Sequence, residues 1–158
     1  MYGATVARGV EKQFWYSALD TVTMGCLMDE FQALSFAGEY TTVEELQAEF
    51  LELAYSYGLT EEDYAVSLSS LFLFIPHNFY YPFYYISYAV SVIPAMQIGA
   101  MAKTDREAAI EAYATMILMD DGETSFENLL AEAGLASPFT REAWTKIAQG
   151  VNALVGVE

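Results

Sequence analysis

Residues 75–89, IPHNFYYPFYYISYA, gather phenols and the only histidine of the chain in one short stretch. Tyr81, Tyr84, Tyr85 and Tyr88 are separated by intervals of three, four and seven, which predicts that they share one side of a helix and its entry. Phenols placed in this way can donate hydrogen bonds to a polarised carbonyl or an oxyanion, and His77 just ahead could add a further donor. The alternative is packing, with the rings buried and the hydroxyls sent to water or backbone. From spacing alone, packing is the commoner explanation of an aromatic row.

Other chemistry has less support in the residue types. Zinc needs about three or four converging His, Cys or carboxylate ligands, whereas the chain has one histidine, one cysteine and no His-Glu-x-x-His pair. Cys26 and His77 are the only conceivable nucleophile–base couple, and a lone cysteine in an apolar helix is usually a small core residue. Two acidic pairs outside any EF-hand-like loop are more typical of solvated helix ends than of calcium or magnesium sites: Asp29–Glu30 and Asp120–Asp121.

The charge and cysteine content restrict partners and location. A net charge of −16, from 22 acids against 6 bases, repels phosphate backbones and anionic lipids, so we expect neither nucleic acid nor membrane as a partner. The single cysteine excludes an internal disulfide and favours a reducing compartment, which predicts a cytoplasmic protein. The first residues contain no apolar stretch followed by a small-residue cleavage site, so no signal peptide is expected.

Residues 64–102 contain no Asp, Glu, Lys or Arg. This length could hold a membrane-spanning helix, but Pro76, Pro82 and Pro94 interrupt it, and Arg and Lys do not flank it in the way that the positive-inside rule expects. The better interpretation is a pair of helices buried nearly all round, which implies a larger protein or a partner surface.

Helical signals run from end to end, and no segment alternates apolar and polar residues as a strand would. Four Ser/Thr-x-x-acid patterns predict helix starts at Thr42, Thr60, Thr104 and Thr124, and Pro82 suits the first position of a further helix. We expect helices at about 5–36, 42–58, 60–75, 82–102 and 140–154. Two further helices are expected between the last two of these, one that ends before Gly122 and a short one that ends before Gly134. The expected fold is therefore all-α, an array of about six to seven helices with a long first helix and a buried helix pair, in a single domain over residues 1–158.

Three segments carry a family resemblance. The stretch IPHNFYYPFYYISYA resembles the His- and Tyr-rich segment near the carboxyl end of the oligoendopeptidase F and thimet oligopeptidase family of zinc metallopeptidases, and its run FYYISYA is the most specific part. The stretch EKQFWYSALDTVTMGCLMDEFQ is similar to the long helix after that family's metal site, and AYATMILMDDGETSFENLLAEAGLASPF to its closing segment. The resemblance covers nearly the whole chain from about Glu11.

The resemblance implies a carboxyl-terminal part of a larger catalytic domain that hydrolyses short peptides. The family's zinc ligands, a His-Glu-x-x-His helix and a later glutamate, lie before the region that this chain resembles, so zinc is implied for the full-length enzyme and for no residue here. By resemblance, His77, Tyr81 and Tyr88 correspond to residues that bind substrate and stabilise the transition state, with Tyr84 and Tyr85 as further substrate-binding candidates. We therefore expect the chain to be inactive alone, with the remainder of the peptidase as its partner.

A second hypothesis remains open. The missing metal site and the apolar residues 64–102 also fit a non-catalytic helical module that self-associates or binds a partner chain. Under that hypothesis, protein contacts would cover the tyrosines.

Overall fold

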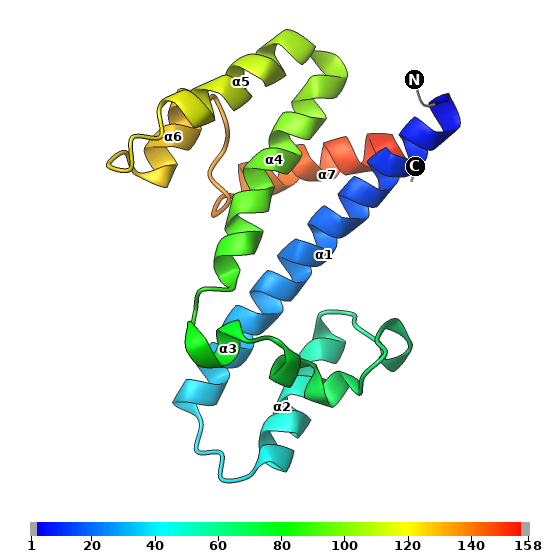
Figure 1. Cartoon of the computed structure of the whole chain (residues 1–158), viewed down its shortest axis with the longest axis vertical. Helices are drawn as coiled ribbons and strands as arrows, with labels where there is room; N and C mark the ends of the chain where they lie inside the picture. Colours follow the sequence, from blue (N-terminus) through cyan, green and yellow to red (C-terminus); the bar gives the residue numbers. More distant parts are fainter. Residues whose placement is uncertain (1–2, 156–158) are drawn as a thin grey trace. The chain divides into compact units, whose positions relative to one another are not determined.

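The computed structural model describes residues 3–155, and within them it consists of helices without a strand (Figure 1). The elements are α1 (Ala4–Ala37), α2 (Val43–Ser56), the 3-10 helices η1 (Glu61–Asp63) and η2 (Leu68–Phe74), α3 (His77–Tyr80), α4 (Ile86–Thr104), α5 (Arg106–Leu118), α6 (Phe126–Glu132) and α7 (Arg141–Val155). The predicted all-α class and the long first helix are confirmed. The two ends of the predicted domain, 1–2 and 156–158, lie outside the described residues.

The chain divides into two compact units. The central unit is residues 20–89, and the terminal unit combines the residues up to 19 with those from 90 onward. The two long helices α1 and α4 contribute to both. Each unit is described by itself below, and the expected single domain stays a prediction.

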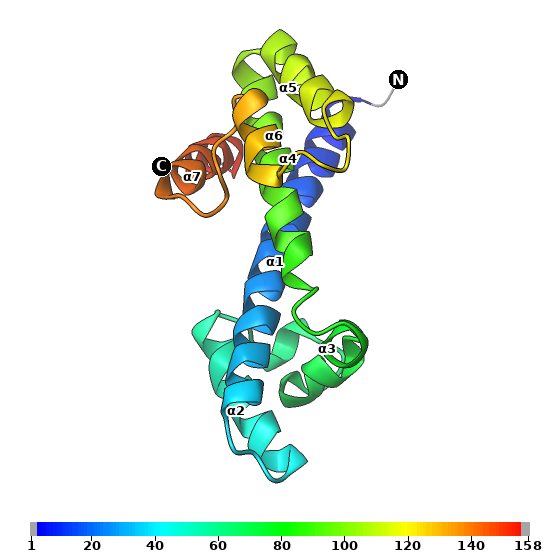
Figure 2. The ribbon, with the colours of Figure 1, turned by 90° about the vertical axis from the view of Figure 1, so that its left-hand side faces the viewer.

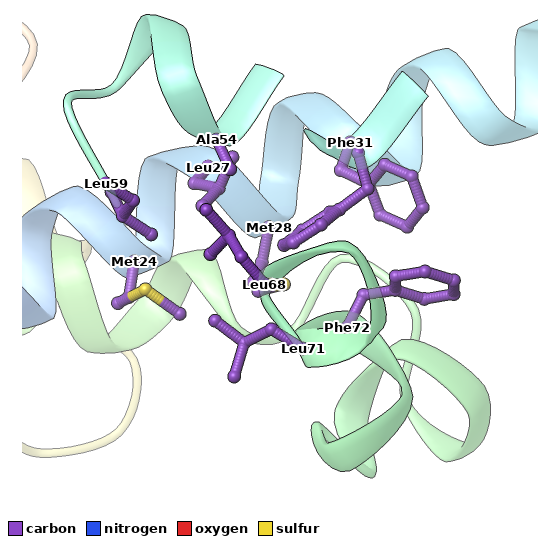
Figure 3. Packing of buried hydrophobic residues seen from close by; sticks show 10 residues of the cluster. Met24, Leu27, Met28, Phe31, Ala54, Leu59, Leu68, Leu71 and Phe72 are labelled. Atoms are coloured by element: carbon purple, nitrogen blue, oxygen red, sulfur yellow. The ribbon is translucent and has the colours of Figure 1, made fainter. Parts of the chain in front are cut away.

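The core of the central unit forms where α2 and η2 pack on the second half of α1 (Figures 1 and 2). Figure 3 shows this packing, to which α1 contributes Leu27 and Phe31 and η2 contributes Leu68 and Phe72. Phe50 of α2 completes a cluster of three phenyl rings, with ring centroids 4.9 Å from Phe31 and 5.3 Å from Phe72. Burying one such side chain contributes about 1.5–3 kcal/mol, so this cluster is the main apolar anchor of the unit.

The predicted α-helix at 60–75 is wrong, because two short 3-10 helices occupy this segment. The hydroxyl of Thr60 donates to Asp63, 2.7 Å away, and the amide of Leu68 donates to the carboxylate of Glu61 at 3.0 Å. These side chains, together with the serines of the sequence SLSS, compete with the regular i to i−4 ladder. The tighter winding places Leu68, Leu71 and Phe72 in the core.

The helix predicted from Pro82 starts four residues later, at Ile86. Phe83 has φ 61°, in the left-handed region, and no helix can pass through that conformation. Residues 81–85 therefore form a turn that leads from α3 into α4.

A glycine fixes where α4 starts in the central unit. A Cβ atom at Gly25 of α1 would lie 2.6 Å from the Cβ of Ala89, far inside van der Waals contact. Ala89 is itself buried, so the two small residues allow α1 and the first turn of α4 to approach closely. This contact sets the position of Tyr88, the residue before Ala89.

The terminal unit has a smaller core, in which α5 packs against α6. Two of its helices are capped one residue after the predicted threonines, because Asp105 accepts from the amide of Ala108 and Ser125 from that of Asn128. Of the four predicted starts, Thr42 and Thr60 in the central unit form reciprocal capping boxes, with Glu45 and Asp63 respectively.

Burial along residues 64–102 is uneven. Buried side chains such as Leu71 and Met96 alternate with large exposed ones, which are Leu73, Phe74, Phe79, Tyr80, Tyr81, Phe83, Tyr84 and Tyr88. Among residues 3–155, no helix combines the length and the apolar character needed to cross a membrane.

Candidate functional site

The central unit brings His77 together with the predicted tyrosines at its surface. His77 is the first residue of α3, and its ring stacks on Tyr84 with a centroid distance of 5.7 Å and an interplanar angle of 10°. Tyr85 and Tyr88 meet the same imidazole edge-on, each with a centroid distance of 5.5 Å. His77 therefore lies at the centre of the group, which is called the histidine–tyrosine cluster below. Its members are His77, Tyr81, Tyr84, Tyr85 and Tyr88.

The tyrosines meet in a different way from the one their spacing predicts. Only Tyr88 belongs to the helix α4, whereas Tyr81, Tyr84 and Tyr85 lie in the turn before it. The rings of Tyr84 and Tyr88 are 5.8 Å apart, and Tyr81 lies at the outer end, 6.3 Å from Tyr84. The prediction of one shared helix side is therefore wrong for Tyr81, Tyr84 and Tyr85, although the four tyrosines do lie close together as predicted.

The phenols of the cluster reach the surface. Tyr81 is 67% exposed, Tyr84 53% and Tyr88 41%, so the simple packing alternative does not describe them. Tyr85 is the half-buried member, and burial, followed by the charges of Asp20 and Tyr88, raises the pKa of its hydroxyl. The cluster therefore has a buried edge at Tyr85 and an open edge at Tyr81 and Tyr84.

One hydrogen bond orients the donors of the cluster. His77 Nε2 lies 3.2 Å from Tyr88 Oη, while His77 Nδ1 is buried and has no partner among the described residues. Because buried N–H groups without an acceptor are rare, we assign the ring hydrogen to Nε2. His77 is then the donor, and Tyr88 directs its own hydrogen to an acceptor other than His77.

Two polar residues that support the site were missed by the sequence analysis. The Nδ2 of Asn78 donates to the carbonyl of Phe72 at 2.9 Å, which ties α3 to the core. Gln32, buried on α1, accepts from the amide of Phe83 at 2.8 Å. The signal that could have identified Gln32 is its place between the apolar residues Phe31 and Ala33 of the first helix.

The other candidate groups gain no support. Burial, followed by the charges of Asp29 and Glu30, raises the pKa of the Cys26 thiol, which opposes the thiolate that a Cys–His couple needs. Asp121 accepts from the amides of Glu123 and Thr124 and so closes a local turn.

No group of three His, Cys, Asp or Glu side chains suited to a metal ion occurs in the described part of the chain. The residues present therefore do not fit a zinc site of the kind the resemblance implies for the full-length enzyme.

The chain matches no protein-family model, no curated protein and no solved structure.

Proposed function

We propose that this chain is the carboxyl-terminal portion of a zinc metallo-oligopeptidase, a hydrolase of short peptides, and that it supplies the wall that binds and polarises the substrate. The observation that supports this proposal best is the hydrogen bond between His77 and Tyr88 within a row of exposed phenols. The resemblance of residues 75–89 to the corresponding segment of the oligoendopeptidase F family supports it independently.

The proposed role of the cluster follows from its hydrogen-bond direction. His77 donates to Tyr88, which makes the phenol a better donor because hydrogen bonds in a chain polarise one another. Tyr88 then donates to the carbonyl oxygen of the peptide bond, and most strongly when that oxygen gains negative charge. One such donor typically contributes about 10²–10³ in rate. Tyr81 and Tyr84, at the open edge, bind the neighbouring part of the peptide.

The proposal places the metal outside this chain. Its own residues bind, orient and polarise the substrate, and we expect no peptide hydrolysis by the chain alone, with or without added zinc. The single cysteine favours a reducing compartment, and so the cytoplasm, as the place of action.

A ligand titration tests the proposal directly. A short peptide in which a phosphinate replaces one amide presents a tetrahedral anionic oxygen, and it is added to the chain with 15N-labelled histidine. We expect the ring nitrogen signals of His77 to shift and saturate, and Tyr88→Phe to weaken binding by about tenfold or more, because a hydrogen bond to a charged acceptor is lost.

The matched control is Tyr113→Phe, which removes another exposed phenol, from α5 in the terminal unit. This control should bind the phosphinate peptide like the unaltered chain. The proposal is wrong if His77 shows no saturable shift, or if Tyr88→Phe binds as tightly as the control.

A second function has one observation in its favour. Large apolar side chains of the central unit are exposed beside the cluster, among them Leu73, Phe74 and Phe79, and such patches often mark interaction surfaces. A non-catalytic module would self-associate through them. Sedimentation at micromolar concentration would then show dimers that Phe74→Ser abolishes, without any response of His77 to the phosphinate peptide.

A further inference from the structure

Phe83 has an unusual backbone conformation at the edge of the cluster. Its φ of 61° is the only positive value found for a residue other than glycine in the part of the chain that the structure describes. This region is unfavourable for a bulky L-residue, and such conformations persist only where surrounding contacts impose them. Phe83 is one residue before Tyr84, so whatever imposes the strain also places that ring.

The contact that imposes it comes from the buried amide of Gln32. Gln32 is 2% exposed, and its Oε1 accepts from the amide of Phe83 at 2.8 Å, across 51 residues of sequence. Its Nε2 donates to the carbonyl of Met28 in the same helix at 3.1 Å, which fixes the orientation of the amide. Both ends of the side chain are therefore occupied, and only one orientation satisfies both bonds.

The strained residue is enclosed in a turn that carries two of the cluster's tyrosines. The amide of Tyr84 donates to the carbonyl of Tyr81 at 3.1 Å, so Phe83 lies inside a closed β-turn. The ring of Phe83 packs against Phe36 of α1 with a centroid distance of 5.5 Å. The bond to Gln32 thus anchors the middle of the turn, while Tyr81 and Tyr84 at its two ends face outward.

We propose that Gln32 is a positioning residue that holds this turn in its strained form and so stacks Tyr84 on His77. Without the acceptor on Gln32, Phe83 relaxes to a negative φ, and the direction of the chain into Tyr84 changes. Gln32 itself does not touch a substrate. The inference rests on the proposed function for what the tyrosines bind, but the placement that it describes can be measured without any ligand.

The experiment compares two replacements of nearly equal size. Gln32→Met removes the acceptor and the donor, whereas Gln32→Glu, when protonated, keeps an oxygen for the Phe83 amide and a hydrogen for the Met28 carbonyl. The readouts are the nuclear Overhauser contacts between the rings of His77 and Tyr84 and the 15N shifts of the imidazole. We expect Gln32→Met to lose the contacts and shift the nitrogen signals, and Gln32→Glu to match the unaltered chain in both when the three proteins are compared at one pH below about 4, where an ordinary carboxyl is protonated.

The matched control is Gln97→Met in the terminal unit. Gln97 is also a buried glutamine on a long helix that binds distant backbone, with Nε2 and Oε1 each 2.9 Å from Ala136. Both Met variants should lower the melting temperature by roughly 3–8 °C, because each leaves buried backbone groups without a partner. Only Gln32→Met should change the His77 and Tyr84 signals, measured well below the melting range.

Unchanged ring contacts in folded Gln32→Met overturn the proposal, because Gln32 is then a stabilising residue and nothing more. If Gln32→Met does not fold, the bond between Gln32 and Phe83 is tested in the unaltered chain by hydrogen exchange. The Phe83 amide should exchange with solvent roughly a hundredfold more slowly than an open turn, and fast exchange counts against the bond. Failure of the phosphinate titration, in contrast, removes the proposed function and leaves the ring placement intact.

Discussion

Two aromatic clusters lie in the central unit, and they differ in chemistry and in exposure to solvent. The phenylalanine cluster, formed by Phe31, Phe50 and Phe72, has centroid distances between 4.8 and 5.3 Å and is buried. Rings in the histidine–tyrosine cluster lie 5.3 to 6.3 Å apart, yet three of its four phenols are exposed. Rings without hydroxyls thus form the core, and rings with hydroxyls form a surface.

The difference teaches what each cluster is suited for. Apolar rings gain most from leaving water, and the phenylalanine cluster uses its rings for stability alone. The second cluster leaves ring area of Tyr81, Tyr84 and Tyr88 exposed to solvent, which adds little to stability. A surface of that kind is explained by a ligand better than by folding.

Truncating one ring in each cluster should give the largest contrast. We expect Phe50→Ala to lower the free energy of unfolding by about 3–5 kcal/mol, because it leaves a cavity in the core. Tyr84→Ala, at a site 53% exposed, should lower it by less than about 1 kcal/mol. Urea denaturation followed by far-ultraviolet circular dichroism measures both, and equal losses would show that the tyrosines are core residues after all.

Exchanging the hydroxyls between the clusters gives a smaller effect. Phe50→Tyr places a hydroxyl in an apolar site and should lower the free energy of unfolding by about 1–3 kcal/mol. The reverse change, Tyr84→Phe, should be nearly neutral. Thermal melting of the two variants compares them, and a neutral Phe50→Tyr would mean that water or a polar partner reaches the ring.

The sequence predicts the helices better than it predicts the segments that connect them. Helical residue patterns locate α1 within a few residues, and the capping box at Thr42 locates α2, because its hydrogen bonds are local. The segment 60–75 reads as helical by the same rules, yet Glu61 and Asp63 fold back onto backbone and hydroxyl groups and favour 3-10 turns. Competition of that kind depends on which side chain reaches which amide, and spacing does not reveal it.

The candidate site shows the same limit. Intervals of three and four predict that Tyr81, Tyr84 and Tyr88 lie close together, and they do. The reason is a strained turn held from α1 by Gln32, a contact across 51 residues of sequence. No local pattern encodes such a contact, so the sequence predicts the gathering of residues and misses its cause.

Half-buried tyrosines allow the comparison to be tested by pH. Tyr57 donates to Glu30 at 2.7 Å, and burial first, then this bond, raises the pKa of its hydroxyl above the usual value. The pKa of the Tyr85 hydroxyl is also raised, mainly by burial. When the pKa of a tyrosine is higher in the folded state than in the unfolded state, the tyrosine stabilises the folded protein. The stabilisation is complete at pH values below the unfolded-state pKa, about 10. That stability is lost as the pH rises through the folded-state pKa.

We therefore expect urea midpoints to fall as the pH rises above about 10, and to fall less in Tyr57→Phe, which removes the titrating hydroxyl. Tyr16→Phe, an exposed phenol of α1, is the control and should keep the full dependence. If the two variants have the same alkaline profile, Tyr57 does not contribute to it.

Removing the hydroxyl of Tyr88 should have the smallest effect on stability and the most informative one on the cluster. Tyr88→Phe keeps the ring against Tyr85 and deletes the exposed hydrogen bond with His77, so we expect a loss of about 0.5 kcal/mol or less in the free energy of unfolding. In the same variant His77 Nε2 loses its protein acceptor, and its 15N signal should move towards that of a water-exposed imidazole. A melting temperature lowered by several degrees with an unchanged His77 signal would mean that the hydroxyl serves packing, as in the phenylalanine cluster. An unchanged melting temperature with a shifted His77 signal would show that this hydroxyl orients His77 and does not stabilise the fold, unlike the rings of the phenylalanine cluster.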